Sequence, residues 1–231
     1  MLSALTDVTL PGALSALTAR DARLARIVAD YGPPPLWARE PGFPTLLHII
    51  LEQQVSLASA RAAFDKLREA ASPLTPERFL ELDDVTLKAV GFSRQKTRYG
   101  RELAQAIRSG SLDLGVLHTL DDEAVRAALT RVVGIGRWTA DIYLLMALGR
   151  PDVWPAGDLA LATAARHAFG LEAAPDPAAL EALGEPWRPW RAVAARVLWH
   201  FYLSAGAKKH NEIGLEPSGG FSPTKASIPE R

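Results

Sequence analysis

Helix start signals recur along this chain and constrain its fold more than any other feature. Thr75, Asp83 and Ser93 each precede an apolar pattern of helical period, which is where an N-cap side chain stands. Gly110 follows the third pattern, as glycine often follows a helix, and Asp121 begins the next. Ala, Leu and Arg are abundant, and no β-branched alternating run typical of strands is present. The sequence therefore predicts an all-α fold of about ten short helices.

Proline and glycine mark the boundaries of the longer segments. The N-terminal amphipathic pattern ends at residues 32–35 (GPPP), and a long helical run follows from residue 45 to about residue 71. Pro189 begins the last helix, which we expect to end at about Ala205. Residues 208–231 are rich in Gly, Pro, Ser and charge, and we expect them to form a flexible tail.

Composition excludes several kinds of site. The chain has no cysteine, which excludes disulfides, thiolate zinc sites and cysteine-held iron–sulfur clusters. No apolar stretch approaches the roughly 20 residues of a membrane span, and the N-terminus lacks the order of a signal peptide. A cytoplasmic location is therefore expected, with the nucleoid if the source is bacterial. Because the formal net charge is +0, nucleic-acid binding would depend on a local basic face such as residues 93–101 (SRQKTRYGR).

The most specific local feature is the turn Gly134-Ile135-Gly136, between two helical patterns in residues 129–140. Two glycines around one apolar residue permit a turn too tight for side chains. The backbone N–H groups of the turn then stand at the N-terminus of the next helix, where they can bind a phosphate without reading a base. Thr139, in the first turn of that helix, adds a hydroxyl donor. Taken alone, the pattern favours a plain helix corner that uses glycine for geometry.

Four separated motifs, in this order, resemble the helix-hairpin-helix (HhH-GPD) DNA glycosylase superfamily. Within it, they are similar to the compact 3-methyladenine DNA glycosylase II (AlkA-type) branch, over about residues 45–202. The motifs are EQQVS at 52–56, GRWTA at 136–140 in the hairpin, WPAGD at 154–158 and PWR at 189–191.

The resemblance implies a two-lobe, all-α fold without an N-terminal β-sheet domain, because too few residues precede Thr45 for that domain. One lobe would combine residues 1–44 with 150–207, and the other would be the central helices 45–149. The DNA groove is expected between them. Val133 stands where the family usually has a proline.

Asp158 matches the catalytic aspartate of the family. An alkylated purine is a good leaving group, and its departure leaves positive charge on the sugar. One carboxylate can stabilise that oxocarbenium ion and orient or deprotonate the attacking water. Ordinary glycosidases need a second carboxylate to protonate the leaving group. Without the resemblance, an aspartate before a helix is normally an N-cap, and both roles can coexist.

Trp138 indicates the subtype of reaction. Members of the superfamily that also cut the DNA strand carry a lysine here, which forms a Schiff base with the sugar. Arg137 is adjacent, but arginine stays protonated and cannot act as the amine nucleophile. The resemblance thus implies a monofunctional enzyme that leaves an abasic site.

Trp138 and Trp199 match aromatic residues of the base pocket, where an indole favours a cationic base. Tyr143 is a possible neighbour, and Ile142 replaces an expected aromatic, which predicts a roomier pocket.

Further residues match DNA and cation contacts of the family. Gln53 and Gln54 lie where the family carries, at a break in a long helix, the wedge that fills the space of a flipped base, and Gln54 matches better. Ser93 and Lys96, with Arg94 and Arg98, are expected near the DNA backbone; the alternative is a solvated helix face. Hairpins of the family hold a monovalent cation, Na⁺ or K⁺, through backbone carbonyls. The matching positions here are Thr130, Val132 and Ile135. No cofactor is expected for catalysis.

The expected partner is double-stranded DNA containing alkylated bases, bound by a monomer. The likeliest lesions are purines methylated at N3 or N7. N1-methyladenine, N3-methylcytosine, ethenoadenine and hypoxanthine stay open. The alternatives are another glycosylase class of the superfamily, disfavoured by the missing cysteines and by Trp138, and a non-catalytic hairpin protein that binds damaged DNA.

Overall fold

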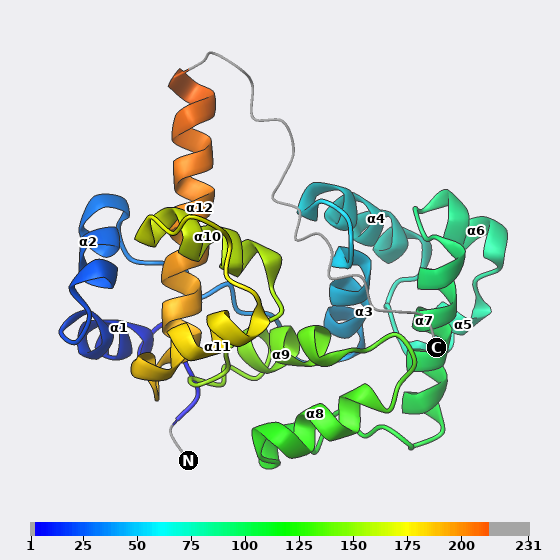
Figure 1. Cartoon of the computed structure of the whole chain (residues 1–231). Coiled ribbons are helices and arrows are strands. Elements are labelled where there is room, and N and C mark those ends of the chain that lie inside the picture. The colour runs from blue at the N-terminus through cyan, green and yellow to red at the C-terminus, as the bar shows by residue number, and fades with distance from the viewer. Residues whose placement is uncertain (1–2, 213–231) are drawn as a thin grey trace. The chain divides into compact units, whose positions relative to one another are not determined.

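The computed structural model describes residues 3–212, and this part of the chain is helical (Figure 1). It contains twelve α-helices, two short 3₁₀-helices and no strand, which confirms the predicted all-α class. Within the described residues, no helix combines the length and the apolar character needed to cross a membrane.

The first of two compact units comprises the described residues of Met1–Ala38 and Gly149–Arg231. Its centre is α12, which packs against α1, α2 and α10 and is buried from Arg191 to Trp199 (Figure 1). The packing of α10 on α12 places the N-terminus of α10 beside α12. The helices of the unit are α1 (Leu10–Thr18), α2 (Ala22–Tyr31), α10 (Leu159–Phe169), α11 (Pro177–Gly184), η2 (Glu185–Trp187) and α12 (Arg191–Glu212).

The second unit is Arg39–Leu148. Its apolar helix α3 contacts α4, α7 and α9, and Leu46, Ile49 and Ile50 on α3 are fully buried. The helix α7 also carries α5 and α6, and α8 pairs with α9 across the hairpin. The helices of the unit are α3 (Phe43–Glu52), α4 (Leu57–Ala70), α5 (Pro76–Glu81), α6 (Asp84–Ala89), α7 (Arg94–Arg108), η1 (Leu117–Thr119), α8 (Asp122–Thr130) and α9 (Arg137–Met146).

The predicted N-caps are confirmed. The side chains of Thr75, Asp83, Ser93 and Asp121 each accept a hydrogen bond from the backbone N–H three residues on. Each bond satisfies one of the N–H groups that the first turn of a helix leaves unpaired. Local side-chain chemistry therefore starts these helices where the sequence indicates.

Two predicted boundaries are wrong. The run expected from residue 45 to residue 71 is two helices, because α3 ends at Glu52 and Ser56 caps α4 through the Ser59 N–H. The last helix begins at Arg191, after Pro189, and continues to Glu212, into the segment expected to be a tail. The remainder of that predicted tail, 213–231, lies outside the described residues.

Asp21 connects two parts of the first unit. Its carboxylate caps α2 through the Arg23 and Leu24 N–H groups, and it accepts a hydrogen bond from the buried Trp187 indole, Nε1 to Oδ2, at 2.9 Å. Hydrogen bonds from the Arg23 side chain and from Trp187 hold the pKa of Asp21 well below its usual range, against the opposing effect of burial. The ionised carboxylate therefore stabilises the fold.

Replacing Asp21 by alanine should lower the free energy of unfolding by about 2 kcal/mol, since the cap is lost and a buried N–H loses its acceptor. Asp176 is an exposed cap of α11, and Asp176→Ala should cost about 1 kcal/mol. Because the pKa of Asp21 is lowered in the folded state, its contribution is present at neutral pH and is lost below about pH 4. Denaturant titrations at several pH values measure this; equal losses in both variants, independent of pH, would contradict it.

Candidate functional site

Asp158 is a buried carboxylate in the first unit, 3% exposed, at the N-terminus of α10. Its Oδ1 accepts a hydrogen bond from the Leu161 N–H at 2.7 Å, which caps the helix. The same oxygen accepts the indole N–H of Trp199, on α12, at 3.2 Å. Two N–H donors, from α10 and from α12, fix the orientation of this carboxyl group. Asp158 is thus a helix cap that is also held by the neighbouring helix.

The segment before Asp158 is held in place by the core of the same unit. The Trp154 indole donates to the Leu180 carbonyl at 2.8 Å, and a Cβ at Gly184 would lie 2.8 Å from the Trp154 ring. The Asp158 N–H then donates to the Pro155 carbonyl at 2.9 Å, which closes the turn into α10. The WPAGD motif therefore forms a hydrogen-bonded turn that positions Asp158 at the N-terminus of α10.

In the second unit, the two glycines of the hairpin serve different purposes. Gly134 has φ +93°, and a Cβ there would lie 2.1 Å from Cγ of Tyr99 on α7, so the turn is seated on the tyrosine ring. Gly136 is the N-cap of α9 with φ −92°, and nothing lies within 4 Å of a Cβ placed there. The fold therefore requires Gly134, whereas Gly136 leaves the N-terminus of α9 open to a ligand. Tyr99 is a partner that the sequence pattern did not single out.

Gln53 and Gln54 are distinguished by the structure. The Gln53 side chain is turned inward, and its Nε2 donates to the Gly134 carbonyl at 2.9 Å and to Thr139 Oγ1 at 3.0 Å. Thr139 is 1% exposed, so its hydroxyl lies beneath the turn and not on the surface expected to meet a phosphate. Gln54 is exposed and has φ +58°, a left-handed conformation that glycine adopts more easily.

The basic segment at the start of α7 is only partly a surface feature. Ser93 caps the helix, its Oγ accepting the Lys96 N–H. Lys96 is partly buried, and its Nζ donates to the Leu51 carbonyl near the C-terminus of α3 at 2.7 Å. Burial lowers the pKa of the Lys96 ammonium. Arg94 and Arg98 are exposed. Lys96 therefore braces α3, and the two arginines are the cations that face solvent.

The four residues predicted for a base pocket have unequal exposure. Tyr143 is fully buried in the second unit, and its hydroxyl accepts the Gly42 N–H at 3.0 Å. Burial raises the pKa of this phenol, in keeping with a core position. Ile142 is 3% exposed, whereas Trp138, at the start of α9, is half-buried. Trp199 lies against Asp158 in the first unit. Tyr143 and Ile142 thus belong to the core, Trp199 contacts Asp158, and Trp138 is partly accessible.

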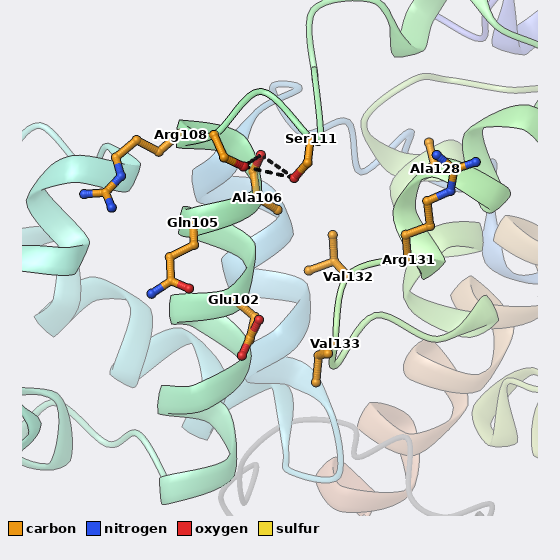
Figure 2. Close-up of a pocket in the computed structure, with 10 residues that line it drawn as sticks. Glu102, Gln105, Ala106, Arg108, Ser111, Ala128, Arg131, Val132 and Val133 are labelled. Atoms are coloured by element: carbon orange, nitrogen blue, oxygen red, sulfur yellow. Dashed lines mark hydrogen bonds between the residues drawn. The ribbon is translucent and has the colours of Figure 1, made fainter.

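A cleft of about 800 Å³ lies between α7 and the end of α8 with the hairpin (Figure 2). Glu102 and Gln105 line it from α7, and Val132 and Val133 line it from the hairpin. None of the residues predicted for the base pocket lines this cleft. It is therefore distinct from the predicted base site.

The candidate cation site is a set of backbone oxygens. The Val132 carbonyl accepts the Ile135 N–H at 3.0 Å within the turn, which leaves it one lone pair. Neutral carbonyl oxygens suit a monovalent cation. Elsewhere, the part of the chain that the structure describes has no group of three His, Cys, Asp or Glu side chains placed to hold a metal ion.

A family model described as HhH-GPD superfamily base excision DNA repair protein matches residues 47–189. The chain belongs to this superfamily. DNA-3-methyladenine glycosylase 1 of Schizosaccharomyces pombe is 30% identical over 190 residues, which cover 80% of this chain and 83% of the relative. Putative DNA-3-methyladenine glycosylase YfjP of Bacillus subtilis is 28% identical over 76% of this chain and 64% of its own length. The names of these relatives support the identification of this chain as a DNA glycosylase, and the matches confirm the resemblance inferred from the four motifs.

Solved structures of the superfamily share the fold. The S. pombe 3-methyladenine DNA glycosylase Mag1, in complex with abasic DNA, matches with a TM-score of 0.75 and 29% identity, over 81% of this chain and 95% of that chain. DNA-3-methyladenine glycosidase from Bacillus halodurans matches with a TM-score of 0.70 and 28% identity, over 85% and 91% of the two chains.

Replacing the two hairpin glycines by alanine should give opposite phenotypes. Gly136→Ala should change the free energy of unfolding by less than about 1 kcal/mol but weaken binding to duplex DNA about tenfold, because its methyl group would stand at the open N-terminus of α9, where a phosphate is expected. Gly134→Ala should cost about 3 kcal/mol of stability through backbone strain and overlap with Tyr99. Denaturation and fluorescence anisotropy measure the two effects; wild-type DNA affinity in Gly136→Ala would contradict the assignment.

Proposed function

We propose that this protein is a monofunctional DNA glycosylase that hydrolyses the N-glycosidic bond of alkylated bases, such as 3-methyladenine and 7-methylguanine, in double-stranded DNA. The observation that carries the proposal is the buried Asp158 carboxylate, which accepts two N–H donors in a chain of the base excision repair superfamily. The names of the S. pombe and B. subtilis relatives support the choice of lesion.

In the proposed mechanism, Asp158 stabilises charge. Alkylation at N3 or N7 puts positive charge on the base, so the base can leave without being protonated. As the bond to C1′ breaks, the sugar develops positive charge, and a carboxylate already held in place stabilises it without reorganisation. The Leu161 N–H and the Trp199 indole supply that preorganisation. The same carboxylate orients or deprotonates the water that attacks C1′.

The lesion must leave the base stack before it can reach Asp158. A DNA phosphate binds at the open N-terminus of α9, next to Gly136, where N–H groups and the helix dipole favour an anion. Exposed Arg94 and Arg98 contact the DNA backbone. Gln54, exposed and held in a left-handed conformation, fills the space of the flipped base. A monovalent cation at the Thr130, Val132 and Ile135 carbonyls would add positive potential beside the bound phosphate.

Trp138 supports hydrolysis without strand cleavage. The position that carries the Schiff-base lysine in lyase members is a tryptophan, and Arg137 beside it cannot form an imine. Sodium borohydride should therefore trap no covalent enzyme–DNA adduct during turnover. The product strand should carry an intact abasic site that breaks only on alkali treatment. A borohydride-trapped adduct on a denaturing gel would show that the protein has lyase activity.

The decisive variant is Asp158→Asn. Asparagine caps a helix as well as aspartate does, so folding and DNA binding should persist while base release falls at least about 100-fold. Asp176→Asn makes the same change at the cap of α11 and should keep the wild-type rate. Single-turnover release of methylated bases measures the rate. A wild-type rate in Asp158→Asn would refute the catalytic role, and a wild type that binds damaged duplex but releases no base would favour the non-catalytic alternative.

A further inference from the structure

The exposed Gln54 turn and the glycine hairpin are joined by one side chain. Both N–H groups of the Gln53 amide are used, one on the Gly134 carbonyl at 2.9 Å and one on Thr139 Oγ1 at 3.0 Å. The Gly134 carbonyl can only accept, so the amide nitrogen must face it. Gln53 therefore holds the turn at 53–56 against the carbonyl of the hairpin and against the first turn of α9.

A second contact holds the end of α3, from which that turn leaves. The Lys96 ammonium donates to the Leu51 carbonyl, at the C-terminus of α3, where the helix dipole favours a cation. Gln53 is itself the C-cap of α3, and Ser56 is the N-cap of α4. Gln53 before Gln54, and Ser56 two residues after it, thus each make side-chain hydrogen bonds. Gln54 lies between them with its side chain exposed.

The backbone of Gln54 is left-handed between these contacts. A non-glycine residue with φ +58° is strained, and such strain persists only where the surroundings determine it. The contacts that determine it include the two Gln53 bonds to the hairpin. Without those bonds, the turn can relax toward an unstrained backbone, and the Gln54 side chain would change direction.

We propose that Gln53 is a positioning residue that couples the phosphate-binding hairpin to Gln54, so that a phosphate bound at α9 sets where Gln54 enters the duplex. This inference rests on the proposed function, in which Gln54 fills the space of a flipped base. Gln53 itself touches neither the base nor the reacting sugar. Its contribution is needed only when a base must be removed from a paired duplex, since an unpaired strand offers no stacked partner to displace.

The test compares paired and unpaired substrates. Gln53→Met keeps the length of the side chain and removes the amide that donates to Gly134 and Thr139. Single-turnover release of 7-methylguanine from a duplex should fall about tenfold, because both hydrogen bonds that hold the turn to the hairpin are lost. Release from the same strand unpaired should fall less than about threefold. The ratio of the two rates is the readout, because a general loss of active protein lowers both rates equally.

Three further variants sharpen the test. Gln105→Met makes the same change at an exposed glutamine of α7 in the same unit and should leave both rates and their ratio unchanged. Thr139→Val removes one acceptor of the Gln53 amide from the hairpin side, and it should lower the ratio in the same direction even if Gln53→Met folds poorly. Adding Gln54→Ala to Gln53→Met should cost little beyond either change alone, since both act through the same contact.

Equal losses on paired and unpaired DNA in both Gln53→Met and Thr139→Val would overturn the proposal, as would unchanged duplex release in both. Additive effects of the Gln53 and Gln54 substitutions would also overturn it. These outcomes differ from failure of the proposed function itself, in which the wild type releases no base from either substrate.

Discussion

Local structure depends on the carboxyl oxygen Oδ1 of Asp158, and in the proposed function the chemistry depends on it as well. It caps α10 through the Leu161 N–H and accepts the Trp199 indole N–H from α12. The first bond starts a helix, and the second depends on the packing of α10 on α12 in the core of this unit. Any packing change that moves α12 therefore moves the donor that orients the carboxylate. Stability and electrostatic preorganisation are the same contact here.

The second unit has a different constraint in the proposed function, in which it presents the open N-terminus of α9 to a phosphate. Tyr99 lies under Gly134, and Gln53 binds the Gly134 carbonyl, so the hairpin is held from two helices. A Cβ placed at the neighbouring Gly136 would have no other atom within 4 Å. A turn held on its inner side and open on its outer side can bind a phosphate without first becoming ordered, which reduces the entropic cost of binding.

Local signals in the sequence predicted much of this architecture. The N-caps at Thr75, Asp83, Ser93 and Asp121 depend on residues three positions apart, and all four are confirmed. The sequence pattern alone joined α3 and α4 in one run, whereas the resemblance placed a break at Gln53 and Gln54, where α3 ends. The break arises where Ser56 begins a new helix.

The partners of the site residues could not be read from the sequence. Lys96 looked like a surface cation, but its ammonium reaches the Leu51 carbonyl, a contact between residues 45 positions apart. Tyr143 looked like a pocket aromatic, but its hydroxyl is bound to the Gly42 N–H. The motifs indicate which residue types stand at a site, whereas burial and long-range hydrogen bonds decide what each side chain can touch.

Identification of the released products shows whether this chain releases alkylated bases from DNA. Duplexes that each carry one defined lesion would be incubated with the wild-type protein, and the free bases would be separated by chromatography and identified by mass. The account predicts release of 3-methyladenine and 7-methylguanine as intact free bases, with unbroken abasic strands left behind. Release of none of the alkylated bases from duplexes that the protein demonstrably binds would contradict it.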